Sequence, residues 1–257
     1  MLHVSSSAPA HRWAKERLSK LARSRKTRLR QEALCEIVFR PLAHLVVLAL
    51  APLRVPPPAV VLASTAFGVA GAVELARGHL IVAALLVQAK TVFDNADGQL
   101  ARLTNRVTAF GRYLDSECDL LVDAALFAGL GWYTGRPFLA ALGFVALTAV
   151  LSINFNVERL ARGAAATWDR SLLGRAYGVL YGWQDRLAER VLRERPAFFT
   201  VGALAQLGMS TQLAVFGVCI AVGRPLVYVW LLLAQVVFVA GLCLLTPPDQ
   251  EVSLEHR

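Results

Sequence analysis

Cysteine and histidine are scarce in this sequence, and neither occurs in a pattern that binds a transition metal. The 257 residues include four cysteines without a CxxC pair and five histidines that never approach the spacing of a metal site. The cysteines lie in or beside apolar segments, where a free thiol usually acts as a small buried hydrophobe. We therefore expect no zinc site, and any metal must be held by oxygen ligands.

The sequence also lacks the short motifs that mark many soluble enzymes. It contains no Walker loop, no GxSxG elbow and no GxGxxG turn between a strand and a helix. No internal repeat is visible, and no compact apolar region with a small-residue cleavage site follows the basic N-terminus. These absences argue against a nucleotide hydrolase, a serine hydrolase and a secretory signal peptide.

Acidic residues are fewer than basic residues, and the difference is concentrated in particular segments of the chain. The chain has 27 Lys and Arg against 18 Asp and Glu, and residues 12–30 carry nine of those basic residues and a single acid. At the same time 56% of the residues are hydrophobic and the mean hydropathy is +0.51. This composition indicates a membrane protein, so we expect the basic segments to face a lipid bilayer and not nucleic acid.

Long apolar runs fill most of the chain after residue 57. Six of them are close to the ~20 residues that a bilayer requires. They are 58–76, 79–102, 111–133, 137–157, 198–222 and 225–245. The sequence thus predicts an all-α integral membrane protein with six transmembrane helices. The basic segments place both termini, the 103–110 connector and the 158–197 loop in the cytosol, and the expected location is the cell membrane, as a multi-pass protein.

Two further segments are expected to lie on the membrane surface. Glu36, Arg40 and His44 form one polar stripe on the apolar run 33–50, which is typical of an interfacial helix. The 158–197 loop shows a helical period of apolar residues, which predicts an amphipathic cytosolic helix. The expected organisation is therefore a basic arm and interfacial helix (1–53), a six-helix catalytic domain including that loop (54–247) and a tail (248–257).

Four aspartates, Asp94, Asp97, Asp115 and Asp119, lie in or beside two of the predicted spans. Carboxylates that near hydrocarbon are costly, so they are expected to serve a function. Asp94, Asp97, Gly98, Ala101 and Arg102 share one helix face, and Gly111, Asp115 and Asp119 share one face of the next helix. The short connector 103–110 lets the two helices run antiparallel and brings both faces together.

Paired carboxylates without histidine or thiolate suit hard divalent cations such as Mg²⁺ or Mn²⁺. Two such ions can clamp a phosphoryl group during in-line displacement. Gly98 and Ala101 remove side-chain bulk from the same face, which leaves room for a ligand beside the backbone. Arg102, one helical turn from Gly98, is placed to make a charge-assisted contact with a phosphate.

The run Asp94–Arg102 (DNADGQLAR), followed by Gly111, Asp115 and Asp119, resembles the signature of the CDP-alcohol phosphatidyltransferases at eight fixed positions. That family transfers a phosphatidyl group from a CDP-linked lipid, usually CDP-diacylglycerol, to an alcohol hydroxyl and releases CMP. The resemblance implies that Asp94, Asp97 and Asp115 would ligate two divalent ions. Asp119 would be the general base and could also touch a metal. The residues framing the CDP moiety would be Asp97, Gly98, Ala101, Arg102 and Gly111.

Other functions and partners stay open at this level. An acid-lined transporter or cation channel is the main alternative, but spans four to six offer no matching acidic relay. An anchor for a cytosolic partner through 158–197 would leave the aspartates unexplained. A homodimer is open because Gly68, Gly71 and Ala72 allow close helix approach. Asp123, one turn beyond Asp119, is expected to support helix packing or the other aspartates, with direct participation in the site as the alternative.

The acceptor alcohol is not specified by the motif. Glycerol phosphate, inositol phosphate, inositol, serine and choline-type alcohols all fit the shared chemistry. Four arginines, Arg159, Arg162, Arg170 and Arg175, follow the fourth predicted span and could bind a phosphate on the acceptor. They also fit the simpler roles of setting topology and attracting anionic lipids. We favour a phosphorylated acceptor, an alcohol phosphate, for this sequence.

The all-carboxylate motif predicts an enzyme that depends on a hard divalent metal. Excess chelator should abolish CMP release from the CDP-linked lipid, and added Mg²⁺ or Mn²⁺ should restore it, while Zn²⁺ restores it poorly because none of the fixed motif positions is a His or Cys. Undiminished turnover in excess chelator would contradict a metal-dependent reaction.

Overall fold

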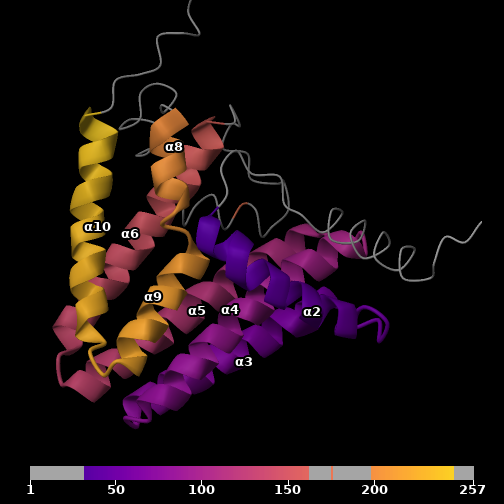
Figure 1. The fold of residues 1–257 in the computed structure, drawn as a ribbon, viewed down its shortest axis with the longest axis horizontal. Coiled ribbons are helices and arrows are strands. Elements are labelled where there is room, and N and C mark those ends of the chain that lie inside the picture. Colours follow the sequence, from indigo (N-terminus) through magenta and orange to yellow (C-terminus); the bar gives the residue numbers. More distant parts are fainter. Residues whose placement is uncertain (1–31, 162–174, 176–197, 246–257) are drawn as a thin grey trace, which may run out of the picture.

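The computed structural model describes residues 32–161, 175 and 198–245, and the regular structure within those ranges is all helical (Figure 1). In chain order the helices are η1 (Cys35–Phe39), α2 (Arg40–Leu50), α3 (Pro57–Ala76), α4 (Leu80–Leu103), α5 (Ala109–Thr134), α6 (Pro137–Ala161), α8 (Phe198–Ala205), α9 (Met209–Ala221) and α10 (Leu226–Leu245). The expected all-α class is confirmed for the described residues. The basic arm, most of the 158–197 loop and the tail lie outside them.

Local sequence signals set the ends of the long helices. Pro57 occupies the first turn of α3, where its missing N–H costs nothing. Thr108 caps α5 by accepting a hydrogen bond from the Gly111 N–H at 3.0 Å. At the other end of α5, Gly135 adopts a left-handed conformation with φ of 66°, which closes the helix and turns the chain into α6.

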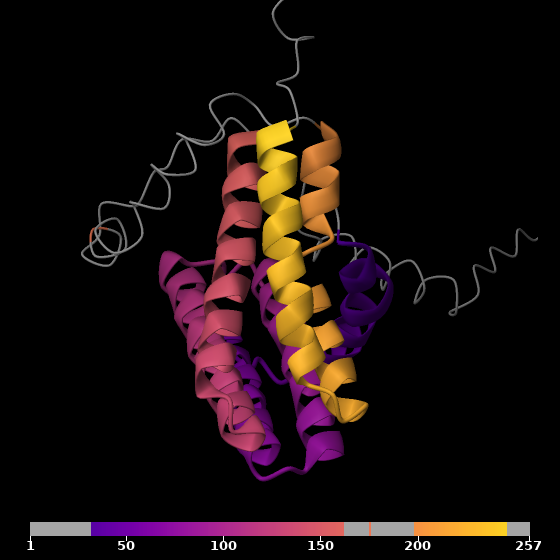
Figure 2. The same ribbon diagram turned by 90° about the vertical axis from the view of Figure 1, so that its left-hand side faces the viewer.

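The helices form two groups that meet along α5 and α9. In the first group α3 packs along both α4 and α5, and α2 lies across α4. In the second group α6 contacts α8 and α10, and these three helices run side by side in both views (Figures 1 and 2). α5 contacts α6 and α4 contacts α9, which joins the groups.

An aromatic stack marks the core between the two groups. The ring of Phe216 on α9 lies 5.7 Å from that of Phe127 on α5 and 4.6 Å from that of Tyr228 on α10, measured between centroids. The buried Tyr228 hydroxyl donates to Gln212 Oε1 at 3.2 Å, so its polar end is satisfied. The core therefore combines large apolar rings with a hydrogen-bonded polar group.

Each of the six apolar segments contains helix, although their lengths differ from expectation. In the described part of the chain, Pro57–Ala76 and Pro137–Arg159 are the two helices long and apolar enough to cross a membrane. Shorter apolar helices cover Met209–Ala221 and Leu226–Gly241. α4 and α5 carry the charged motif, which interrupts their apolar runs.

The predicted fifth span, 198–222, is divided into α8 and α9. The break lies at Gly208, which precedes α9 in an extended conformation. The Glu32 carboxylate sits at this break and accepts from the Thr211 backbone N–H at 2.5 Å and from the Thr211 hydroxyl at 2.6 Å. An acid supplied from a distant segment thus caps α9, which local sequence could not reveal. α6, in contrast, runs four residues beyond its expected end at 157, to Ala161.

The segment 33–50 is helical, as expected, but its polar stripe faces the protein. Arg40 and Glu36 form an ion pair, and their side chains are only 12% and 15% exposed. The backbone carbonyl of Arg40 accepts a hydrogen bond from Gln99 of α4 at 3.2 Å. Ile37 and Leu45 point outward instead, with 75% and 60% of their surface exposed. The outer face of this helix is therefore apolar.

The small residues considered for a dimer contact are used within the chain. Gly68, Gly71 and Ala72 are buried. A Cβ on Gly68 would collide with Val122 of α5, and the Ala72 carbonyl lies against Gly129 of α5. This stripe lets α3 approach α4 and α5 closely, so it is not available for a homodimer interface.

Because α3 and α5 approach closely, one methyl group added at their contact should have a large effect on stability. An ideal Cβ on Gly129 would lie 2.5 Å from the Ala72 carbonyl oxygen. We expect Gly129→Ala to lower stability by about 1–3 kcal/mol, because the helices must separate. The readout is the thermal unfolding midpoint in detergent.

Gly241→Ala is the matched control, because nothing lies within 4 Å of a Cβ at that position in α10. Alanine is also the better helix former, by about 1 kcal/mol. A Gly129→Ala protein that unfolds at or above the temperature of Gly241→Ala would contradict the packing described for α3 and α5.

Candidate functional site

Three of the four motif aspartates meet where the C-terminal part of α4 approaches the start of α5. Asp94 and Asp97 lie on α4, and Asp115 lies on α5. One carboxylate oxygen from each lies within 4.8 Å of the others. α4 and α5 make few other direct contacts, and both pack along α3. The two motif faces therefore come together at the carboxylates, as the spacing predicted.

The carboxylate group fits a hard divalent cation. Asp97 is buried, and its Oδ2 has no hydrogen-bond partner among the described residues. Asp94 and Asp115 are half-buried, so the group is also open on one side. Three converging carboxylates, one of which also has a buried oxygen without a partner among the described residues, are the kind of donor set that Mg²⁺ or Mn²⁺ requires.

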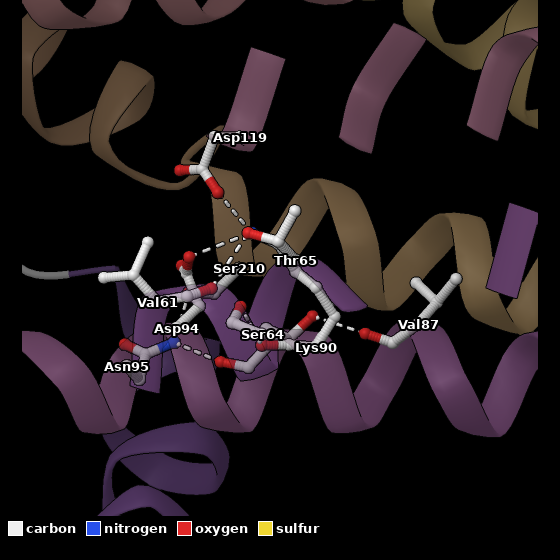
Figure 3. A network of polar contacts seen from close by, with 10 residues as sticks. Val61, Ser64, Thr65, Val87, Lys90, Asp94, Asn95, Asp119 and Ser210 are labelled. Atoms are coloured by element: carbon white, nitrogen blue, oxygen red, sulfur yellow. Dashed lines mark hydrogen bonds and ion pairs between the residues drawn. The ribbon is translucent and has the colours of Figure 1, made fainter. Parts of the chain in front are cut away.

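The fourth motif aspartate, Asp119, contacts a buried lysine. Lys90 Nζ donates to Asp119 Oδ1 at 2.5 Å and to Asp94 Oδ1 at 2.9 Å, which joins α4 to α5 (Figure 3). The Lys90 side chain is 1% exposed, against 17% for Asp94 and 24% for Asp119. Asp119 is thus tied to the site through Lys90 and is not one of the three converging carboxylates.

Sequence reasoning missed Lys90, although a signal was present. Lys90 precedes Asp94 by four residues, which puts both side chains on the same face of α4. A lysine inside an apolar run, one turn before an aspartate motif, could have been assigned to the site on that spacing. Its contact with Asp119 depends on the packing of α5 and had no sequence signal.

The remaining motif residues surround the carboxylates on the same two helices. An ideal Cβ on Gly98 would lie 3.2 Å from Arg102 Nη1, so the guanidinium lies directly over the glycine. Ala101 and Arg102 are half-buried near the end of α4. Gly111 lies in the first turn of α5, where its N–H is bound by Thr108. Small side chains and one guanidinium therefore border the aspartates.

A polar chain fixes α4 against two other helices beside the site. Asn95 Nδ2 donates to Thr91 O at 2.9 Å and to Ser210 Oγ of α9 at 3.1 Å (Figure 3). The Cys35 thiol of η1 donates to Asn95 Oδ1 at 3.1 Å. Because Asn95 directly follows Asp94, these contacts restrain the helix that carries the first aspartate.

The structure describes Asp123 and two of the four arginines that were expected to bind the acceptor. Asp123 is buried one turn beyond Asp119, and its Oδ1 has no hydrogen-bond partner in the described part of the chain. Arg159 lies in the last turn of α6, and its Nη2 donates to Asn156 Oδ1 at 3.2 Å. Arg175 is exposed, and Arg162 and Arg170 fall outside the described residues. The expected grouping of these arginines over the aspartates is therefore not tested.

A partly buried cluster of three carboxylates on two helices, bordered by glycines and an arginine, defines a metal-dependent site in an all-helical protein. The sequence model of the CDP-alcohol phosphatidyltransferase family matches residues 54–241, more than half of the chain. The chain belongs to the CDP-alcohol phosphatidyltransferase family, and the whole motif lies inside the matched region.

Relatives of the chain include several phosphatidylinositol phosphate synthases. That of Corynebacterium glutamicum is 34% identical over 145 residues, which cover 54% of this chain and 64% of the relative. That of Mycolicibacterium smegmatis is 43% identical over 108 residues, which cover 40% of this chain and 49% of the relative. The matched segments thus span less than two thirds of these relatives' lengths.

A solved structure of phosphatidylinositol phosphate synthase from Mycobacterium tuberculosis, in complex with manganese and citrate, also aligns with the chain. The alignment has 27% identity and a TM-score of 0.40, and it covers 72% of this chain and 87% of that one.

Proposed function

We propose that this chain is a membrane enzyme that transfers a phosphatidyl group from a CDP-linked lipid to an alcohol hydroxyl and releases CMP. The observation that carries the proposal is the convergence of Asp94, Asp97 and Asp115 to within 4.8 Å at the junction of α4 and α5. Membership of the CDP-alcohol phosphatidyltransferase family supports the same reaction. CDP-diacylglycerol is the proposed donor.

The converging aspartates are proposed to hold two divalent cations. Asp94, Asp97 and Asp115 supply the ligands, and Asp119 can add an oxygen because it is joined to Asp94 through Lys90. When bound, Mg²⁺ or Mn²⁺ would neutralise the diphosphate of the donor and stabilise charge that develops on its oxygens. The unsatisfied Asp97 Oδ2 supports this assignment, because a buried carboxylate oxygen normally has a partner.

Asp119 is proposed to act as the general base. The acceptor hydroxyl oxygen forms a bond to the phosphorus of the phosphatidyl group, the bond from that phosphorus to the CMP oxygen breaks, and CMP leaves with the electron pair. Asp119 takes the hydroxyl proton. Its Oδ1 already accepts from Lys90, so Oδ2 is the oxygen left for this transfer.

The residues that border the carboxylates are proposed to bind the CDP moiety. Gly98, Ala101 and Gly111 leave space beside the helix backbone, and Asp97 lies next to Gly98 in the chain. Arg102 holds its guanidinium over Gly98, within reach of a group seated on that glycine. A guanidinium is suited to a phosphate because it offers several donors in one plane.

The bilayer is proposed to surround the helices, with six crossings and the site facing the cytosol. Large apolar side chains are exposed on the outer surface, including Trp132, Phe138 and Val237 at 80%, 91% and 73%. Such a surface is unfavourable in water and favourable in lipid. The basic residues flanking the site support the cytosolic assignment. A homodimer remains a proposal with no assigned interface.

An inositol phosphate is the proposed acceptor. Two relatives of the chain are named phosphatidylinositol phosphate synthases. The product in that name contains inositol and a phosphate in addition to the phosphodiester. The loop arginines Arg159, Arg162, Arg170 and Arg175 are proposed to pair with the acceptor's phosphate. An acid-lined channel has less support, because no acid is fully buried among the described residues of α6, α9 and α10.

The two assigned roles of the aspartates predict different kinetic defects. Asp119→Asn should retain binding of the CDP-linked lipid but lose ~10²–10⁴-fold in turnover, because a general base is removed. Asp97→Asn should lose both binding and turnover, because a metal ligand is removed. Lipid binding and CMP release are measured separately, and near-normal turnover of Asp119→Asn would assign the proton to another group.

The proposed acceptor site predicts a selective defect. Replacing Arg159 and Arg162 by Ala should raise KM for inositol phosphate about tenfold or more, and leave KM for the CDP-linked lipid unchanged. Arg77→Ala, at the exposed turn between α3 and α4, is the control for loss of one positive charge away from the proposed site. Equal loss for both substrates, or faster transfer to unphosphorylated alcohols, would leave these arginines as topology and lipid contacts.

A further inference from the structure

Lys90 is enclosed by neighbouring helices to a degree that is unusual for a lysine. Its side chain is 1% exposed, and its Cγ lies 3.2 Å from the position that a Cβ on Gly68 of α3 would take. The backbone carbonyl of Lys90 accepts from the buried Ser64 hydroxyl of α3 at 3.2 Å. α3 therefore covers the aliphatic part of the Lys90 side chain, and the ammonium contacts the carboxylates of Asp94 and Asp119.

We propose that Lys90 is a positioning residue for the transfer reaction, which holds Asp119 of α5 and Asp94 of α4 with a single ammonium group. The role given to Asp119 rests on the proposed function. The ammonium contacts Oδ1 of both carboxylates, at 2.5 Å and 2.9 Å. Each carboxylate keeps Oδ2 for a second partner: a metal for Asp94 and the acceptor hydroxyl for Asp119.

The charge balance of the site gives the reason for a lysine here. Carboxylates at this spacing repel one another, and a charge buried without a partner is strongly destabilising. Lys90 is the one fully buried Lys or Arg in the described ranges. It is covalently fixed and stays in place when metals and substrates exchange. Lys90 thus keeps Asp119 and Asp94 in register whether or not divalent cations are bound.

Kinetics of Lys90→Met test the positioning role, because methionine keeps the stem and removes the ammonium. We expect kcat to fall about 10–100-fold, since a misplaced group costs up to about 10² in rate, while KM for the CDP-linked lipid changes little. In an Asp119→Asn background the same substitution should cost less than it does in the wild type, because the part of its effect that acts through Asp119 is already lost and only the contact with Asp94 remains. Losses that multiply in the double variant would overturn the proposal.

Gln88→Met is the matched control. Gln88 lies two residues away on α4 and donates to the Leu213 carbonyl of α9, so the substitution also removes one contact between helices. It should leave kcat unchanged. A Gln88→Met protein as slow as Lys90→Met would show that any disturbance of this part of α4 slows the enzyme, and would overturn the specific role of Lys90.

Thermal unfolding tests Lys90 without using activity. In chelator Lys90→Met should unfold about 5–10 °C below the wild type, because the carboxylates lose their buried partner. Saturating Mn²⁺ should narrow the difference, since the metal supplies positive charge to the same group. A difference that is absent in chelator, or that Mn²⁺ leaves unchanged, would overturn the proposal in favour of packing alone.

Failure to purify Lys90→Met and absence of activity in the wild type have different consequences. If Lys90→Met cannot be purified, Lys90→Gln, which keeps a donor without the charge, is carried through both measurements with the same expectations. If the wild type itself releases no CMP, the proposed transferase function fails. The unfolding comparison needs no turnover and still decides whether Lys90 holds the carboxylates.

Discussion

Repulsion among the carboxylates at the junction of α4 and α5 is the constraint on which the rest of the structure depends. Asp94, Asp97 and Asp115 converge to within 4.8 Å, and this arrangement persists only if positive charge and rigid helices hold it. Lys90 supplies part of that charge. The glycine-lined face of α3 packs α4 and α5 along one helix, so that they approach each other at the aspartates.

Much of the site follows from the sequence because its constraints are local. The period of the motif assigns Asp94 and Asp97 to one helix face, and the short connector before Thr108 forces the next helix to return beside it. Gly78, Gly135 and Gly223 lie at turns between helices and all have positive φ, a conformation that glycine adopts without steric cost. Family membership was predictable for the same reason, since the motif residues are close in the chain.

What sequence reasoning missed depends on contacts between distant segments. Glu32 caps α9 although it lies 179 residues before Thr211 in the chain. This cap stands at the break in the predicted fifth span, and the residues 198–222 alone could not reveal it. The polar stripe of 33–50 faces the protein, where Gln99 of α4 donates to the backbone carbonyl of Arg40. Ile37 and Leu45 are therefore on the exposed face of this segment. Lys90 pairs with Asp119 only because α3 holds α4 and α5 together. Each is a tertiary partner that local periodicity does not encode.

The most direct test of the central claim is the number of Mn²⁺ ions that the chain binds at the aspartates. Mn²⁺ titration of the purified protein in lipid nanodiscs, followed by electron paramagnetic resonance, counts the bound ions without requiring turnover. The account predicts two saturable Mn²⁺ per chain in the wild type, and loss of saturable binding in Asp115→Asn, which removes the α5 ligand from the converging group. Absence of saturable binding in the wild type, or binding that Asp115→Asn leaves unchanged, would contradict it.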